Sequence, residues 1–205
     1  MFGAKLYYFP GAHFTNGFAA NIGIDARFES AFGVKSQDSG GQEFPTSFRG
    51  FGLGARMRHP IGSHTISVVA GYGAQSFRIE AISPTVPAPE IPDVDYEFMR
   101  LGAEIRLVFG TFITEVKFSV LPLMSSGQLS AGEWFPRTTG GGLEAGLVLG
   151  LLLIDDWLEA RAGFEYRRFW FSMNPEPGDP YIAGGALDNY FVGNVGVAIH
   201  WPASD

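Results

Sequence analysis

The chain has 205 residues, enough for one domain of moderate size. Its formal net charge of −7 argues against a nucleic-acid partner, and the absence of cysteine excludes a disulfide framework or a thiolate metal site. Charged residues make up only 17%, below the roughly 25% of an ordinary soluble domain, whereas aromatic residues reach 15% and glycines number 28.

The first residues predict a strand and a turn. Ala4 to Phe14 alternates weakly and is followed by Asn16-Gly17, a dipeptide typical of tight hairpins. No secretory signal peptide is visible at Met1, because Lys5 is followed by aromatic residues and Pro10 rather than by a long apolar core.

Residues 18 to 34 alternate between an apolar and a polar phase. Successive strand side chains point to opposite faces, so this segment predicts a strand with one apolar face and one ionic face. The apolar phase comprises Phe18, Ala20, Ile22, Ile24, Ala26, Phe28, Phe32 and Val34. The polar phase contains Asn21, Gly23, Asp25, Arg27, Glu29 and Gly33.

The same pattern returns along the rest of the chain. It predicts strands near residues 48–58, 65–75, 96–109, 112–120, 143–154, 158–167 and 191–201. The most apolar run, Gly146 to Ile154, is far shorter than the roughly 18 residues of a membrane-spanning helix and is predicted as a strand.

Short and long connections between these strands alternate. The short ones are predicted at Asn16-Gly17, Pro60 to Ser63, Gly110-Thr111 and Asp155-Asp156. The long ones are predicted at residues 36–45, 82–94, 124–139 and 174–188. We therefore expect an all-β, antiparallel up-and-down barrel of about eight to ten strands.

Two kinds of barrel fit this pattern, and they differ in which phase faces inward. A soluble, lipocalin-like ligand-binding barrel would place the apolar phase inside. Three features favour the opposite arrangement. The charged phase is rich in glycine, which a crowded lumen needs, and the apolar stretches run about 9 to 11 residues, the length of a tilted membrane-spanning strand. Aromatic residues bound the apolar phase at both ends, as in interfacial girdles: Phe14, Phe18, Phe109, Phe112 and Trp201 at one end, and Phe32, Phe51, Phe171 and Phe191 at the other.

Over nearly its whole length the chain resembles the small bacterial outer-membrane β-barrel proteins of Gram-negative bacteria. The last strand, with Phe191, Val195, Val197, Ile199 and Trp201 in phase, resembles the aromatic-terminated strand that the barrel-assembly machinery recognises. The resemblance implies location in the outer membrane, short periplasmic turns and long extracellular loops. We expect a single domain over residues 1–205 that lacks its signal peptide. A roughly ten-stranded parent missing its first strand is favoured over an eight-stranded barrel with a leading tail.

The polar phase predicts a lumen filled by charge pairs, since an unpaired buried charge is costly. The predicted network comprises Asp25, Arg27, Glu29, Arg56, Arg58, Arg100, Glu104, Arg106, Glu115, Lys117, Glu144, Glu159, Arg161, Glu165 and Arg167. A wide, porin-like channel is not expected, because porins need roughly 16 strands.

Paired carboxylates in the lumen can be interpreted as a general acid and base, but a salt-bridged plug is favoured, and we expect neither enzymatic activity nor a cofactor. Known barrel enzymes act at the outer end, often with a histidine as base, whereas the four histidines (His13, His59, His64 and His200) are predicted near the periplasmic rim. Clustering of these histidines around a metal is the alternative to their being ordinary rim residues.

The expected partners are lipid, lipopolysaccharide and, during insertion, the barrel-assembly machinery. Arg49, Arg78 and Arg168 fall in the outward phase at the extracellular strand ends, where a guanidinium can bind lipid phosphate. The acidic, proline-rich loops, above all Phe169 to Asp188, are the predicted surface for a ligand or protein. The function expected is structural, anchoring or surface-interacting, and the alternative is a small pore or a conduit for hydrophobic ligands.

Overall fold

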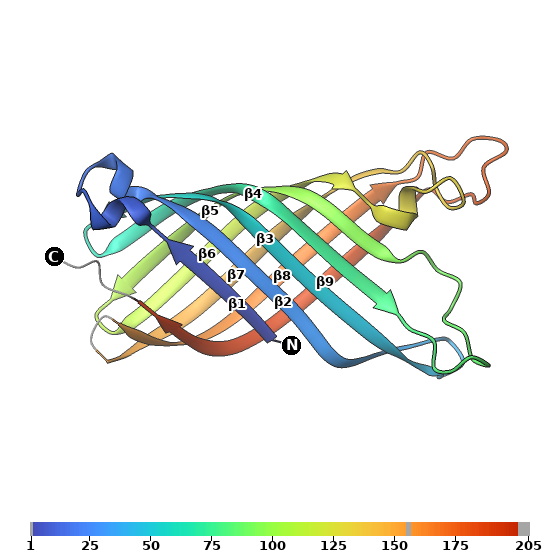
Figure 1. Ribbon diagram of the computed structural model, residues 1–205, viewed down its shortest axis with the longest axis horizontal. Coiled ribbons are helices and arrows are strands. Elements are labelled where there is room, and N and C mark those ends of the chain that lie inside the picture. Colours follow the sequence, from blue (N-terminus) through green and yellow to red (C-terminus); the bar gives the residue numbers. More distant parts are fainter. Residues whose placement is uncertain (1, 155–156, 201–205) are drawn as a thin grey trace.

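The computed structural model describes residues 2–154 and 157–200 of the chain (Figure 1). Its strands are β1 (Phe2–Tyr8), β2 (Ile22–Gln37), β3 (Glu43–Ile61), β4 (His64–Ile79), β5 (Val94–Phe109), β6 (Phe112–Ser125), β7 (Thr139–Ile154), β8 (Leu158–Ser172) and β9 (Gly185–Ile199). Short 3-10 turns form η1 (Pro10–His13), η2 (Phe18–Asn21) and η3 (Gly127–Ser130).

Within the described residues, no helix is long and apolar enough to cross a membrane. The predicted turn at Asp155-Asp156 and the predicted girdle residue Trp201 lie outside the described residues, as does the side chain of Phe32.

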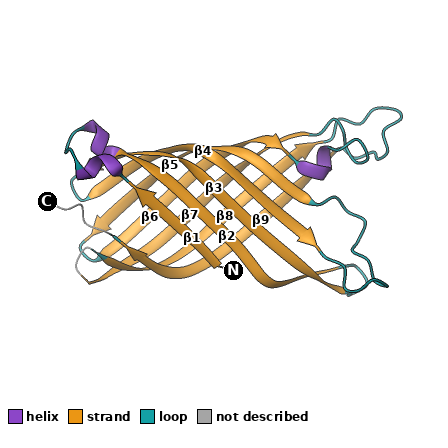
Figure 2. Ribbon diagram, viewed as in Figure 1, coloured by secondary structure: helices purple, strands orange, loops and turns teal. Residues whose placement is uncertain are grey.

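All nine strands form one sheet in which each strand pairs antiparallel with its neighbour in the chain, in the order β1 to β9. The sheet curls into a barrel-like shape, with the loops at residues 80–93, 126–138 and 173–184 gathered at one end, called the long-loop end (Figure 2). β3–β4 and β5–β6 are joined at the other end by the short connections at residues 62–63 and 110–111. The predicted all-β, antiparallel up-and-down architecture is confirmed at the level of the sheet.

The first predicted strand is shorter than expected, and the predicted hairpin at Asn16-Gly17 is wrong. β1 ends at Tyr8, which pairs with Ile24 of β2, so residues 9–21 form a longer connection. Pro10 opens η1 and has no amide hydrogen to continue the strand ladder. The segment Phe18–Asn21, predicted as strand, forms η2 instead.

Several strands extend beyond their predicted ends on the long-loop side. The predicted loop over residues 36–45 is reduced to residues 38–42, because β2 and β3 continue to pair as far as Gln37 and Glu43. An ion pair between Lys35 and Glu43 joins the two strands there, with 2.6 Å between Nζ and Oε2. Polar segments can therefore continue a sheet beyond the stretch in which apolar alternation is visible in the sequence.

The charged phase faces the inside of the curled sheet and the apolar phase faces outward. On β2, Asp25 and Arg27 are 5% and 7% exposed, whereas Ile24 and Phe28 are 44% and 45% exposed. Outward apolar side chains are likewise exposed on the later strands, for example Leu149 on β7 at 56%. The structure therefore has an ionic interior, called the lumen below, and an apolar outer surface.

An aromatic layer fills the lumen toward the long-loop end. It is formed by Tyr96, Phe98, Leu121, Phe169, Phe171 and Met173. The prediction that Phe171 belongs to an outward girdle is wrong: it is only 5% exposed, because it lies in the same strand phase as the inward Arg167. Gly140 and Gly142 on β7 make room for this layer, since a Cβ at either position would lie within 3 Å of the ring of Phe171 or Phe169.

Candidate functional site: the charged lumen

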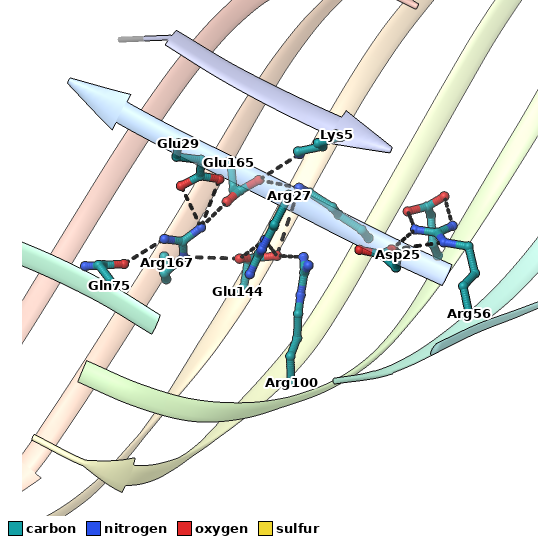
Figure 3. A network of polar contacts seen from close by, with 12 residues as sticks. Lys5, Asp25, Arg27, Glu29, Arg56, Gln75, Arg100, Glu144, Glu165 and Arg167 are labelled. Carbon is teal, nitrogen blue, oxygen red and sulfur yellow. Dashed lines mark hydrogen bonds and ion pairs between the residues drawn. The ribbon is translucent and has the colours of Figure 1, made fainter. Parts of the chain in front are cut away.

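The centre of the lumen is Glu144 of β7, a carboxylate with no solvent exposure. The guanidinium of Arg27 on β2 lies 3.0 Å from its Oε2, and that of Arg167 on β8 lies 3.1 Å from the same oxygen. Arg100 on β5 donates to Oε1. One carboxylate therefore accepts hydrogen bonds from its ladder partner on β8 and from two strands, β2 and β5, that are not its neighbours in the sheet, as Figure 3 shows.

Arg167 extends this group toward β2, β4 and β8. Its guanidinium donates to Gln75 Oε1 at 2.7 Å, to Glu165 Oε1 at 2.7 Å and to Glu29 Oε2 at 3.3 Å (Figure 3). Glu165 also accepts from Lys117 on β6, and from Lys5 on β1 at 3.5 Å. The side chain of Lys5 thus reaches β8 from the opposite edge of the sheet.

Arg56 of β3 forms the second group. It bonds to Asp25 Oδ2 at 2.9 Å and to Glu104 Oε1 at 2.8 Å, and it lies over the ring of Tyr7, 3.9 Å from the centroid. The two carboxylates and the aromatic face replace most of the contacts with water that the Arg56 guanidinium loses on burial.

The third group lies toward the short-turn end, around Glu159 of β8. Its carboxylate accepts from Arg106 at 2.7 Å and Arg161 at 2.8 Å, and lies 2.8 Å from Nε2 of His200. Arg106 and Arg161 also flank Glu115, with nitrogen–oxygen distances of 3.6 and 3.8 Å. Charge pairs therefore continue from the centre of the lumen to its short-turn end.

Glycines on neighbouring strands make room for these long side chains. A Cβ at Gly52 would lie 3.0 Å from Arg27 Nε. A Cβ at Gly146 would overlap Lys117, and one at Gly150 would overlap the carboxylate of Glu159. The glycine-rich polar phase of the sequence is thus explained by charged side chains lying flat across the inner wall.

The residues predicted for the lumen lie in this interior, and all except Arg58 form ion pairs there. Arg58 bonds to Asn21 Oδ1 at 3.3 Å and lies over the ring of Phe9. Four further residues line the lumen that were not predicted there: Lys5, Tyr7, Gln75 and His200. Lys5 and Tyr7 alternate with Leu6 and Tyr8, and this phase was the signal that could have placed them inside. Together these charged residues make up the lumen network. Its cations are Lys5, Arg27, Arg56, Arg58, Arg100, Arg106, Lys117, Arg161 and Arg167. Its anions are Asp25, Glu29, Glu104, Glu115, Glu144, Glu159 and Glu165.

Little space remains among these groups. A cavity of about 20 Å³, with room for about one water molecule, lies between the Arg56 group and the Glu144 group. A larger hollow of about 680 Å³ lies at the long-loop end, between β4, β9 and the loop at residues 88–93. The lumen is therefore filled at mid-height, and a hollow opens at the long-loop end.

The three arginines predicted to bind lipid differ in their surroundings. Arg49 on β3 is exposed and pairs across the ladder with Ser76, next to Arg78 on β4. Arg78 is already engaged, since it lies 3.2 Å from Asp95 and 3.8 Å from Asp93. Arg168 on β8 is half-buried between Leu143 and Asn189. Arg49 is thus the best placed of the three to meet an external anion.

The histidines do not come together as a metal site. In the parts of the chain that the structure describes, no three His, Asp or Glu side chains are grouped as metal ligands. His64 Nδ1 accepts from the backbone N–H of Val108 at 3.1 Å, and His200 is paired with Glu159. Both therefore serve contacts within the fold.

The predicted partner segment, Phe169 to Asp188, is only partly a loop. Residues as far as Ser172 belong to β8, and Asp188 belongs to β9, where it accepts from the hydroxyl of Tyr96. The loop between them is tied to the β6–β7 loop by Arg137, which pairs with Asp179 and Glu176. Trp134 and Tyr181 stack between the same two loops with 5.0 Å between ring centroids.

The pKa of Asp179 is lowered from its ordinary value. The largest cause is the backbone N–H of Glu176, which donates to the carboxylate, and the Arg137 guanidinium adds to it. The charged form of Asp179 therefore accepts the N–H of Glu176 within its own loop and pairs with Arg137 of the β6–β7 loop.

Comparisons with protein-family profiles, with curated proteins and with solved structures found no match.

Proposed function

We propose that the chain is an integral β-barrel protein of the bacterial outer membrane with a plugged lumen, and that it acts as a structural, anchoring or surface-interacting protein through its long loops. The observation that carries this proposal is the inverted arrangement of its faces. Buried Asp25, Arg27 and Glu144 lie inside the sheet, while Ile24, Phe28 and Leu149 are exposed outside. A soluble protein hides large apolar side chains, whereas a barrel in lipid presents them to the acyl chains.

Exposed aromatic residues at the short-turn end agree with this proposal. Phe14 and Phe18 are 88% and 71% exposed, and Phe109 and Phe112 flank the tight turn at Gly110 with 58% and 66%. Rings at such positions suit a membrane–water interface. The loops tied by Arg137 and Asp179 would then lie outside the cell and would be the surface for a ligand or protein.

A small pore or a conduit for hydrophobic ligands is the second candidate. The hollow at the long-loop end, with Phe77, Ile79 and Ile91 in its lining, favours entry of an apolar molecule. The aromatic layer and the Glu144 group fill the lumen beneath this hollow. We therefore rank the plugged barrel first.

Membrane fractionation tests the proposal. The protein, expressed with a signal peptide in a Gram-negative host, should sediment with outer membranes, resist extraction by alkaline carbonate and keep its strand signal in detergent. A folded, monodisperse protein in buffer without detergent would refute the membrane proposal and favour a soluble barrel.

A further inference from the structure

The sheet has two free edges that border the same opening. β1 pairs with β2 on one side and β9 pairs with β8 on one side, and no ladder joins β1 to β9 in the described part of the chain. Lys5 of β1 nevertheless reaches Glu165 of β8, so the two edges flank one seam. Val195 and Val197 of β9 are 87% and 68% exposed there.

An open seam is incompatible with lipid. Given the proposed membrane location, on which this inference rests, backbone N–H and C=O groups along both edges would face hydrocarbon without hydrogen bonds. Barrels in membranes are closed for this reason, and in bacterial single-chain barrels the number of strands is even. The nine strands of the described residues therefore require a further partner at the seam.

Strand direction decides what kind of partner fits. Strands alternate in direction, so β1 and β9 both run toward the short-turn end, and pairing them directly would place a parallel ladder in an otherwise antiparallel barrel. A second copy inserted in the same orientation presents the same two directions and meets the same obstacle. One strand running toward the long-loop end pairs antiparallel with both edges.

Gly196 of β9 supplies an independent observation. It faces the lumen, since its ladder partner is the inward Arg161. Lumen-facing glycines on the neighbouring strands, such as Gly146 and Gly163, are covered by Lys117 and Asn194 respectively, whereas a Cβ at Gly196 would meet nothing within 4 Å. In the pattern of this barrel, such a glycine marks where a large inward side chain from an adjoining strand lies.

Charge indicates the nature of that side chain. Cations outnumber anions in the lumen network defined above. Lys5, whose side chain is 38% exposed, lies at the seam, and Arg161 is the ladder partner of Gly196. An inward carboxylate from the missing strand would pair with these cations.

We propose that the seam between β1 and β9 receives one extended polypeptide strand, antiparallel to both edges, with apolar side chains facing lipid and an acidic side chain facing the lumen over Gly196. The strand completes a ten-stranded closed barrel and hydrogen-bonds both free edges.

Cross-linking of introduced cysteines tests the distance between the edges of β1 and β9. The chain has no cysteine of its own that could react instead. Leu6→Cys on β1 is combined in turn with Val195→Cys, Val197→Cys and Ile199→Cys on β9, in protein extracted from the cells that make it. An intervening strand holds the edges about 10 Å apart, too far for a disulfide. Oxidation should therefore give no disulfide, and a bismaleimide that spans about 10 Å should join at least one pair.

The positive control is Val116→Cys with Leu147→Cys, outward ladder partners on β6 and β7 that should form a disulfide directly. A disulfide in any seam pair would show direct closure, and failure of both reagents would show that the two edges are not held one strand apart. Either result overturns the inference while leaving the membrane proposal intact if the protein still requires detergent.

Hydrogen exchange tests whether a strand is paired with the free edge of β9. Amides of β9 in the extracted protein should exchange at least tenfold more slowly than those in the 205-residue chain refolded alone in the same detergent. Gly196→Leu should abolish this protection, because it competes with the inward side chain. A Cβ at Gly193 also meets open space but faces outward, so the matched control, Gly193→Leu, should keep the protection of the β9 amides.

Equal, fast exchange in both preparations would overturn the inference. Where protection is found, mass spectrometry of the unfolded extract distinguishes a strand in the same polypeptide from one supplied by a second protein.

Discussion

Arg27 and Glu144 are 117 positions apart in the chain, yet Arg27 Nη1 lies 3.0 Å from Oε2 of a glutamate that no solvent reaches. The contact joins β2 to β7 across the lumen. Glu144 also receives Arg100 and Arg167, so a single negative charge holds three cations from three strands. The interior of this sheet is organised by ion pairs where a soluble barrel would use apolar packing.

Replacing Glu144 should therefore be among the most damaging changes in the protein. Glu144→Ala leaves Arg27, Arg100 and Arg167 buried with too little negative charge, and we expect a loss of about 3–5 kcal/mol in the free energy of unfolding. Urea unfolding in detergent micelles measures it. The control is Glu43→Gln, which breaks the exposed pair with Lys35 and should cost about 0–1 kcal/mol. Equal effects of the two changes would contradict the structural role of the network.

A charged side chain placed at mid-height on the outward face should lower the stability of the protein. Leu149→Arg and Ile105→Arg place a guanidinium among exposed apolar side chains, and in lipid each should cost about 2–4 kcal/mol. Ile182→Arg is the control, since Ile182 lies in the β8–β9 loop and is 82% exposed, and should change stability by no more than about 0.5 kcal/mol. The measurement is unfolding from lipid vesicles. Indifference to arginine at both strand positions would refute insertion.

The sequence predicted the strands well where apolar alternation was strong. On β2 the alternation from Ile22 to Phe28 identifies the strand and, together with the glycine content of the polar phase, its inward face. The prediction from sequence failed at residues 9–21. Pro10 interrupts the strand ladder there, and local 3-10 turns replace the hairpin expected from Asn16-Gly17. Propensity alone could not show this, because the ladder between β1 and β2 ends at Tyr8.

The lumen was predictable in composition but not in pairing. Periodicity places Arg27 and Glu144 on the same face of the sheet, but it does not show that they meet, since that depends on how far the sheet curls. The aromatic layer was missed for a different reason: Phe98 and Phe171 lie in the inward phase with Arg100 and Arg167, but apolar rings were expected to face outward. Ion pairs across a lumen follow from curvature, which a single sequence does not encode locally.

Ion conduction should be low. The Glu144 and Arg56 groups and the aromatic layer around Phe169 fill the lumen, and the cavity between the first two is only about 20 Å³. Purified protein in a planar bilayer should give little or no steady conductance, as in protein-free membranes. Large and stable openings would contradict the plug and favour the conduit.

Acidification should release the two tied loops before the barrel unfolds. The pKa of Asp179 is lowered in the folded protein, so its charged form contributes stability at pH values above the ordinary aspartate pKa of about 3.9, and this contribution is lost as the pH falls through the lower folded value. An acid-active protease should cut residues 173–184 faster at pH 3 than at pH 5. Arg137→Gln should already raise cleavage at pH 5, whereas Lys35→Gln, in another loop region, should not.

The last prediction concerns lipopolysaccharide at Arg49. The side chain is exposed at the long-loop end of β3, whereas its neighbour Arg78 is held by Asp93 and Asp95. A free guanidinium can bind phosphate through two parallel hydrogen bonds, while one engaged by two carboxylates must first release them. Arg49→Gln should therefore remove about 1–2 kcal/mol of the stabilisation that added lipopolysaccharide gives, and Arg78→Gln should remove less. Thermal unfolding with and without lipopolysaccharide measures both. Stabilisation of the wild type and the Arg49→Gln protein to the same extent would mean that Arg49 only extends into water.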